Sequence, residues 1–155
     1  MTYETGTGKY ERLLERCASL EAVPTAVVHP CEISALEGAV EAAAKGLVLP
    51  WYVGPAEKIN DLAASKGLEI DASRIVDARH SHESATKAVE LVRLGKAELL
   101  MKGSLHTDEL LSAVVARDAG LRTGRRISHV FIMDVPTYHK VLIITDAAIT
   151  IAPTL

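Results

Sequence analysis

The sequence predicts an α/β protein with three layers, α/β/α, built around a mostly parallel sheet. Short apolar runs that are typical of buried strands alternate with longer segments in which apolar residues recur at helical spacing. A glycine follows most of the helical segments. Because a strand, a helix and another strand in succession usually build a parallel pair, the repeated alternation predicts a parallel sheet with helices on both faces.

The first elements show this alternation clearly. The segment 10–20 places leucines and Cys17 on one side and charged residues on the other, which predicts an amphipathic helix. The apolar run 25–29 predicts the first strand. Ser34, with Glu37 three residues later, has the pattern of a capping box and begins a predicted helix over 34–45, which Gly46 ends.

The same rhythm continues through the middle of the chain. A strand is expected at 47–53, a helix at 56–66 after Pro55, a strand at 74–78, a helix at 83–94, a strand at 98–101 and a helix at 107–118 with Thr107 as its cap. Two last strands are expected at 128–134 and 141–145. The connection 135–139 is too short for a helix, so this last pair is predicted to be antiparallel.

Size and composition narrow the function. The length of 155 residues favours one domain spanning 1–155. A net charge of -3 and an aromatic content of 4% argue against a nucleic-acid partner. No 18-residue apolar window predicts a membrane span, and the N-terminus lacks the apolar core of a signal peptide. Cys17 and Cys31 are interpreted as reduced thiols of a cytoplasmic protein.

The last fifteen residues, 141–155, are mostly apolar, with Asp146 as their only charge. An exposed apolar strip needs a cover. Either this strip packs into the core or the native chain continues beyond Leu155, and we expect the second.

Two segments have weak signals for chemistry. Residues 5–9 (Thr-Gly-Thr-Gly-Lys) resemble a phosphate loop only superficially and are expected to be an N-terminal lead-in. His80-Ser81-His82 allows three interpretations: a metal site that lacks a third ligand, a solvated loop in which Ser81 caps the next helix, and, with Arg79, a loop that faces an anion.

Two segments have stronger signals. Residues 101–107 follow a predicted strand directly and offer Lys102, the flexible Gly103, two hydroxyl groups and a helix start, which together suit a phosphate or carboxylate. Residues 121–129 carry three arginines within five positions, a pattern that favours a polyanion such as a nucleotide phosphate. The alternatives are an ordinary strand-to-helix turn and a solvated surface loop. Asp146 either holds an arginine or caps a following helix.

These segments, in their order, resemble the phosphate acetyl/butyryltransferase family. The resemblance rests on 93–107 (Arg-Leu-Gly-Lys-Ala-Glu-Leu-Leu-Met-Lys-Gly-Ser-Leu-His-Thr), 120–134 and 145–149, and it covers the chain from about Val27 to its end. The sequence at 80–82 and 104–110 is most similar to the transferase part of bifunctional enoyl-CoA hydratase/phosphate acetyltransferases, in which a hydratase domain precedes this region.

The resemblance implies an architecture and an activity. Family members are two-domain proteins with an isocitrate/isopropylmalate dehydrogenase-like fold, usually homodimers. They move an acetyl or butyryl group between phosphate and coenzyme A in a cleft between the domains, without a metal. The chain 1–155 is then expected to be the N-terminal domain, and the C-terminal part would carry the base and the main oxyanion stabilisers. We therefore assign binding roles and no catalytic residue to this chain, and the resemblance does not imply activity of this chain alone.

The resemblance also implies binding residues. Lys102, Gly103 and Thr107 are expected to line the cleft, and Arg126 and Ser128 to approach the phosphates of the acyl phosphate or of coenzyme A. The remaining candidates are Thr145 and Asp146, which end a strand leading toward the second domain, and Arg79, which is placed near a coenzyme A phosphate by position alone. Thr150 stands where the family usually has Asn.

Two other interpretations stay open. A non-catalytic interaction or regulatory α/β module would use the apolar strip 141–155 as a partner or dimer surface. A dehydrogenase-like enzyme of the related fold would need a cluster of aspartates for metal and hydroxy acid. The acidic residues are instead spread along helices, where they suit solvated faces.

Overall fold

The computed structural model describes residues 8–146. The chain divides into two compact units. The first unit combines residues 1–20 with residues 123–155, and the second unit is the continuous stretch 21–122. Each unit has its own sheet, because the four parallel strands all lie within 21–122 and the remaining two strands lie within 123–155.

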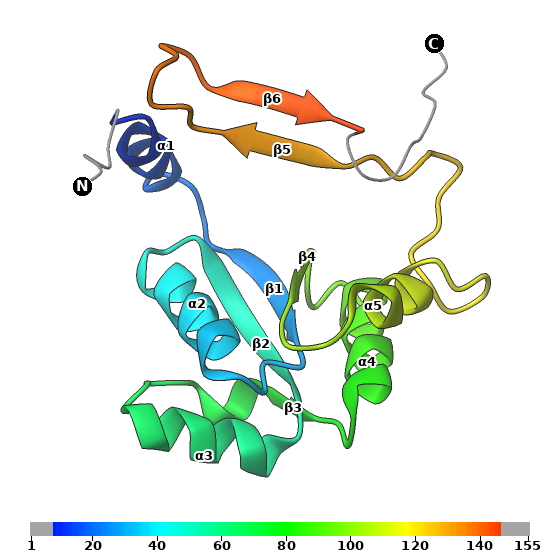
Figure 1. The fold of residues 1–155 in the computed structure, drawn as a ribbon. Helices are drawn as coiled ribbons and strands as arrows, with labels where there is room; N and C mark the ends of the chain where they lie inside the picture. Colours follow the sequence, from blue (N-terminus) through cyan, green and yellow to red (C-terminus); the bar gives the residue numbers. More distant parts are fainter. Residues whose placement is uncertain (1–7, 147–155) are drawn as a thin grey trace. The chain divides into compact units, whose positions relative to one another are not determined.

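The second unit is built on a four-stranded parallel sheet (Figure 1). Its strands are β1 (Val23–Val28), β2 (Val48–Gly54), β3 (Ile75–Asp77) and β4 (Leu99–Lys102). They lie in the order β3-β2-β1-β4, and all neighbours are parallel. The chain therefore moves from β1 outward through β2 to β3 and then returns to the other side of β1. This reversal makes the boundary between β1 and β4 the topological switch point of the sheet.

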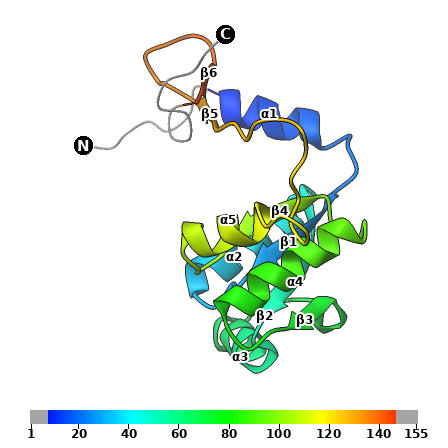
Figure 2. The ribbon, with the colours of Figure 1, turned by 90° about the vertical axis from the view of Figure 1, so that its right-hand side faces the viewer.

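Helices cover both faces of this sheet (Figures 1 and 2). Those of the second unit are α2 (Ile33–Ala44), α3 (Ala56–Lys66), α4 (Ser81–Arg93) and α5 (Thr107–Val114), with a short 3-10 turn η1 (Ala72–Arg74) before β3. Successive residues of β1 point to opposite faces. Val27 packs in the cluster formed with α2 and α3, whereas Ala26 and Val28 pack in the cluster formed with α4 and α5. The three-layer α/β/α prediction is confirmed.

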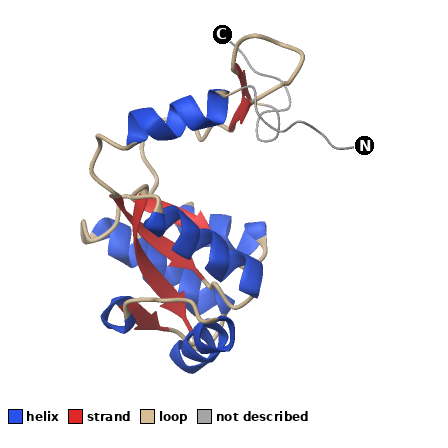
Figure 3. Cartoon of the chain, turned by 90° about the vertical axis from the view of Figure 1, so that its left-hand side faces the viewer, coloured by secondary structure: helices blue, strands red, loops and turns tan. Residues whose placement is uncertain are grey.

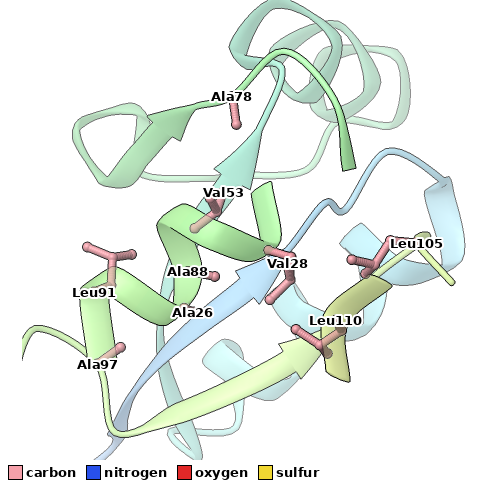
Figure 4. Close-up of a cluster of buried hydrophobic side chains, with 10 residues drawn as sticks. Ala26, Val28, Val53, Ala78, Ala88, Leu91, Ala97, Leu105 and Leu110 are labelled. Carbon is pink, nitrogen blue, oxygen red and sulfur yellow. The ribbon is translucent and has the colours of Figure 1, made fainter. Parts of the chain in front are cut away.

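Small side chains bring α4 close to the sheet. Ala85 and Ala88 on α4 and Ala26 on β1 are fully buried in one cluster. Figure 4 shows Ala88 of α4 between Val53 and Ala26, Leu91 nearer Ala97, and Leu105 and Leu110 on the other side of Val28. Since alanine has no side chain beyond Cβ, the helix backbone can approach the strands closely, which places the start of α4 near the ends of β1 and β2.

The glycines expected to end α2 and α3 do so, whereas α5 (Thr107–Val114) ends before the predicted boundary at 118. Gly46 has φ +69° and follows α2. Its N–H donates to Ala43 O at 2.9 Å, and the N–H of Leu47 donates to Ala42 O at 3.0 Å. This pair of bonds is a Schellman motif, which glycine allows because it adopts positive φ without strain. Gly67 ends α3 at the same place that the sequence predicts.

The predicted helix starts were less accurate. The Ser34–Glu37 capping box is wrong, because Glu32 occupies the N-cap position of α2 and makes no side-chain capping bond. The cap of α4 is His80 rather than Ser81, and its Nδ1 accepts the N–H of Glu83 at 3.2 Å. His106 precedes α5, so Thr107 is its first helical residue. Histidine therefore stands at the N-cap positions of α4 and α5, where serine and threonine were expected.

The first unit pairs one helix with one hairpin (Figure 3). The helix α1 (Lys9–Cys17) precedes the second unit in sequence, and β5 (Val130–Met133) and β6 (Leu142–Thr145) follow it. The two strands are antiparallel, as predicted, with Val130 opposite Thr145. The side chain of Lys9 is buried, and its Nζ donates to Asp134 Oδ1 at 2.7 Å, Val135 O at 2.9 Å and Tyr138 O at 2.6 Å. The lysine of the superficial phosphate loop is therefore bound inside this unit.

Some expectations fall on residues that the structure does not describe. Most of the segment 5–9, the apolar segment after Asp146 and the position of Thr150 lie wholly or partly outside residues 8–146. Within the described range, the helices are all too short or too polar to cross a bilayer.

Replacing Gly103 tests the contact between β1 and β4. A Cβ added at Gly103 would meet the backbone carbonyl oxygens of Val28 and His29, the second at 2.7 Å. Because backbone cannot move aside cheaply, we expect G103A to destabilise the protein by about 3 kcal/mol, measured by urea unfolding. The matched control is G38A in α2, where a Cβ meets only the Met101 side chain at 4.0 Å. Alanine favours a helix, so G38A should stabilise slightly. Equal effects of the two substitutions would contradict the steric argument.

Candidate functional site

The ends of β1 and β4 are hydrogen-bonded to each other beyond the ladder. The N–H of Gly103 donates to Val28 O at 2.9 Å, and the N–H of Ser104 donates to His29 O at 3.0 Å. The Ser104 hydroxyl donates to His29 O at 2.7 Å and accepts the N–H of Cys31 at 2.9 Å. These bonds fix the loops after both strands at the switch point, where ligands bind in open α/β sheets.

Three predicted binding residues lie in the loop after β4. Lys102 is the last residue of that strand and is exposed, with Nζ 3.5 Å from Gly103 O. Gly103 is packed against the carbonyl oxygens of β1. Thr107 is the exposed first residue of α5. The structure therefore places one cation, one hydroxyl and one helix start in a single loop at the switch point. This combination suits an anion.

Arg79 lies just before α4 and is bound to Glu83. The carboxylate of Glu83 accepts the backbone N–H of Arg79 at 2.9 Å and its Nε at 3.1 Å, and it pairs with Lys87 at 3.0 Å. The backbone bond from Arg79 and the side-chain bonds from Lys87 and Arg79 lower the pKa of Glu83 to about 2. The side chain of Arg79 stays 83% exposed, so the end of its guanidinium can still reach a ligand.

Glu109 joins the starts of α4 and α5. Its carboxylate accepts the Ser81 hydroxyl at 2.7 Å and the N–H of His106 at 2.8 Å, and it lies 3.2 Å from His82 Nε2. The Ser81 hydroxyl, followed by the N–H of His106, holds the pKa of Glu109 below its ordinary value. Arg79 therefore lies at a helix start that Glu109 connects to the start of α5, next to the loop of Lys102, Gly103 and Thr107.

The metal interpretation of residues 80–82 gains no support from the described part of the chain. His80 caps α4 through Nδ1, and His82 faces Glu109. Among residues 8–146, no group of three or more His, Cys, Asp or Glu side chains is placed to hold a metal ion.

His29 is a site residue that sequence reasoning missed. It follows β1 with φ +56°, and its half-buried ring lies with Nδ1 2.9 Å from Ser84 Oγ, a fully buried hydroxyl of α4. Ser84 Oγ also lies 3.0 Å from His80 O. Burial lowers the pKa of His29, and nearby Lys58 lowers it further. The imidazole is therefore neutral at pH 7.

Cys31 lies beside this histidine but is not suited to nucleophilic chemistry. The residue is buried, and burial raises the pKa of its thiol, an effect that Lys58 opposes only in part. Because the thiolate is the reactive form, a protonated buried thiol is inert at neutral pH.

The other four predicted residues lie in the first unit. The Ser128 hydroxyl donates to Asp146 Oδ1 at 2.9 Å, and the N–H of Asp146 donates to His129 O at 2.8 Å. Thr145 ends β6, and Arg126 is exposed in the loop before β5. The structure thus brings Ser128, Thr145 and Asp146 together at one end of the hairpin, and Arg126 precedes them by sequence.

A separate groove of about 470 Å³ lies between α1 and the hairpin of the first unit. Leu13, Ile132 and Val141 line it together with Lys9 and Asp134. Because Lys9 already binds Asp134 and two backbone carbonyls, its charge is neutralised within the unit. Arg12 and Arg16 of α1 also line the groove, so its lining is partly apolar and partly cationic.

Comparisons with known proteins agree on one family. The family model described as phosphate acetyl/butaryl transferase matches residues 78–155. A phosphate acetyltransferase of Rhizobium meliloti is 53% identical over 147 residues, which are 95% of this chain and 46% of that protein. A phosphate butyryltransferase of Clostridium beijerinckii is 31% identical over 93% of this chain and 48% of that protein. The chain spans about half the length of these curated relatives.

Solved structures support the fold. A phosphotransacetylase from Streptococcus pyogenes superposes with a TM-score of 0.74 at 16% identity, covering 94% of this chain and 52% of that one. A branched-chain phosphotransacylase from Enterococcus faecalis gives a TM-score of 0.62 at 23% identity, covering 84% of this chain and 45% of that one.

Removing the Ser84 hydroxyl should destabilise the second unit and release the His29 ring. S84A leaves the imidazole Nδ1 without its buried partner, so we expect a loss of about 1–2 kcal/mol in the free energy of unfolding. Urea unfolding measures this loss. The matched control is S65A, because Ser65 is exposed and bonds only to Leu62 O. A loss in S65A as large as that in S84A would contradict the role of the buried pair.

The ion pairs and hydrogen bonds of the Glu83 carboxylate should make the free energy of unfolding depend on pH. A carboxylate with a lowered native pKa stabilises the fold fully above its unfolded pKa of 4.5, and this contribution disappears as the pH falls toward 2. We expect E83Q to be less stable than the wild type at pH 7 and the difference to shrink between pH 4.5 and pH 2. Urea unfolding over this range tests it, with E37Q on the exposed face of α2 as the control. A difference that is independent of pH would argue against the ion pairs.

Proposed function

The chain belongs to the phosphate acetyl/butyryltransferase family, and on this premise we propose that it forms the N-terminal half of an enzyme that moves an acyl group between phosphate and coenzyme A. The observation that carries the proposal is the loop after β4. Lys102, Gly103 and Thr107 lie together at the switch point, beside the hydrogen-bonded end of β1.

The reaction requires that the thiol of coenzyme A loses its proton and attacks the carbonyl carbon of the acyl phosphate. A carbon–sulfur bond then forms, the bond from that carbon to the phosphate oxygen breaks, and phosphate leaves. Both substrates carry phosphate charges. Donors that are fixed before the reaction stabilise such charge without reorganisation. Residues of this chain would therefore bind and orient, and the base would come from the remaining part of the enzyme.

Each predicted residue has a role that follows from its chemistry. Lys102 and Thr107 would hold one phosphate at the start of α5, and Gly103 would let the backbone approach it. Arg79 and Arg126 would bind phosphates of coenzyme A as exposed guanidinium groups. Ser128, Thr145 and Asp146 would order the end of the hairpin in the first unit.

Finer properties follow from the family resemblance. The assembled enzyme would be a cytoplasmic homodimer, closest to the transferase part of bifunctional enoyl-CoA hydratase/phosphate acetyltransferases. A non-catalytic module is the second candidate. The observation in its favour is the exposed apolar surface of the hairpin, which includes Phe131, Ile132 and Ile143. Light scattering measures the molar mass of the assembled protein and so tests whether it is a dimer.

The transferase proposal is tested by forming acetyl-coenzyme A from acetyl phosphate and coenzyme A. The assay compares the 155-residue chain with the longest polypeptide that its gene encodes. We expect activity in the longer polypeptide, and K102A should lower kcat/KM about tenfold or more through the loss of a charge-assisted bond. The control K66A removes an exposed lysine at the end of α3 and should change nothing. If neither polypeptide is active or binds coenzyme A, the transferase proposal fails and the non-catalytic module remains.

A further inference from the structure

The imidazole of His29 is the group at the switch point that the proposed reaction has not used. Its backbone position is fixed from both sides. The N–H of His29 donates to Val53 O at 2.7 Å, and its carbonyl accepts both the N–H and the hydroxyl of Ser104. A positive φ at a residue other than glycine costs energy and persists where the surroundings impose it. The ring is therefore held at a defined place.

The hydroxyl of Ser84 determines which ring nitrogen carries the proton. This hydroxyl has one hydrogen and two close neighbours, His80 O at 3.0 Å and His29 Nδ1 at 2.9 Å. Two oxygens at 3.0 Å would face each other with lone pairs unless the hydrogen lies between them. The hydroxyl therefore donates to His80 O, and Nδ1–H of His29 donates to Ser84 Oγ. In the neutral ring, Nε2 is then a hydrogen-bond acceptor.

This acceptor is available to a ligand. Within residues 8–146, His29 Nε2 makes no hydrogen bond and is not fully buried. The charged groups that act on the ring are Lys58 of α3, His80 before α4 and Glu109 of α5. Lys58 and His80 lower the pKa of His29, and Glu109 raises it.

A neutral acceptor selects between the two proposed substrates. Phosphate oxygens are acceptors themselves and gain nothing from an unprotonated nitrogen. Acetyl phosphate has no N–H group, whereas the pantetheine arm of coenzyme A has two amide N–H groups, which are strong neutral donors. Resting on the proposed function, we propose that His29 Nε2 accepts a hydrogen bond from an amide N–H of the pantetheine arm and so positions coenzyme A at the switch point.

Two substitutions separate this role from a structural one. H29N tolerates positive φ, and its amide nitrogen can replace Nδ1–H toward Ser84, but it places no atom where Nε2 lies. H29Q carries its amide oxygen farther out, where Nε2 lies, and so restores an acceptor. H139N is the matched control, because His139 is exposed in the hairpin connection of the first unit. Unfolding midpoints of all variants show whether they fold.

The kinetic experiment uses the longest polypeptide that the gene encodes. We expect H29N to raise about tenfold both the KM for coenzyme A and the inhibition constant of pantetheine, which lacks the nucleotide phosphates. The KM for acetyl phosphate should not change, H29Q should recover most of the loss, and H139N should behave as the wild type. An unchanged KM for coenzyme A in folded H29N, or a rise in the KM for acetyl phosphate instead, would overturn the assignment.

A spectroscopic readout is independent of activity. Nitrogen-15 NMR of the imidazoles should show His29 as the Nδ1–H tautomer, titrating below pH 6.5 because its pKa is lowered. The KM for coenzyme A should accordingly stay constant from pH 8 to 6.5 and rise only at lower pH, where the acceptor is protonated. An Nε2–H tautomer would overturn the inference even in an active enzyme. A wild type with neither activity nor coenzyme A binding would instead refute the proposed function, whatever the tautomer.

Discussion

The close approach of β4 to the end of β1 is the constraint on which the second unit depends. Gly103 lies so near the carbonyl oxygens of Val28 and His29 that no side chain fits between them. This approach lets Ser104 bond to both His29 O and Cys31 N, so two loops that are far apart in sequence become one rigid edge. The ligand site of the proposed function and the imidazole of His29 both rest on that edge.

The helices add a second set of connections at the same edge. Glu109 of α5 accepts bonds from Ser81, while Ser84 of α4 reaches back to His29. The cationic side chains and the neutral ring at this edge therefore differ in exposure. Lys102 and Arg79 remain exposed and suit phosphate, whereas the neutral ring of His29 is half-buried and suits an uncharged donor. Coenzyme A, a substrate in the proposed function, offers both kinds of group on one molecule, whereas acetyl phosphate has no N–H donor.

Local patterns in the sequence were sufficient to predict the α/β/α architecture. The helix at 56–66 and the glycines that end α2 and α3 were predicted because their signals are contiguous. Lys102, Gly103 and Thr107 were proposed as binding residues from one contiguous segment, 101–107, and their role stays a prediction. The contact of His29 with Ser84 spans 55 residues and exists only because β4 returns to lie beside β1 and α4 crosses that face. No local pattern contains the strand order, so the histidine at the end of an apolar run had no visible partner. The caps of α4 and α5 were mispredicted because histidine at an N-cap is not among the residues usually expected there.

The two units also differ in how the chain can build them. The second unit is a continuous stretch of 102 residues, from 21 to 122, whose strands are joined by short helical crossovers. The first unit joins segments from both sides of that stretch, and the bond from Lys9 to Asp134 connects residues 125 positions apart. Closing a flexible loop of that length costs more entropy than closing the crossovers, and contacts of long sequence separation form late. If residues 21–122 fold first, the intervening chain is already compact when Lys9 meets its carbonyl and carboxylate partners. We therefore expect the parallel sheet and its switch point to form before Lys9 binds Asp134, the contact that joins the two segments of the first unit.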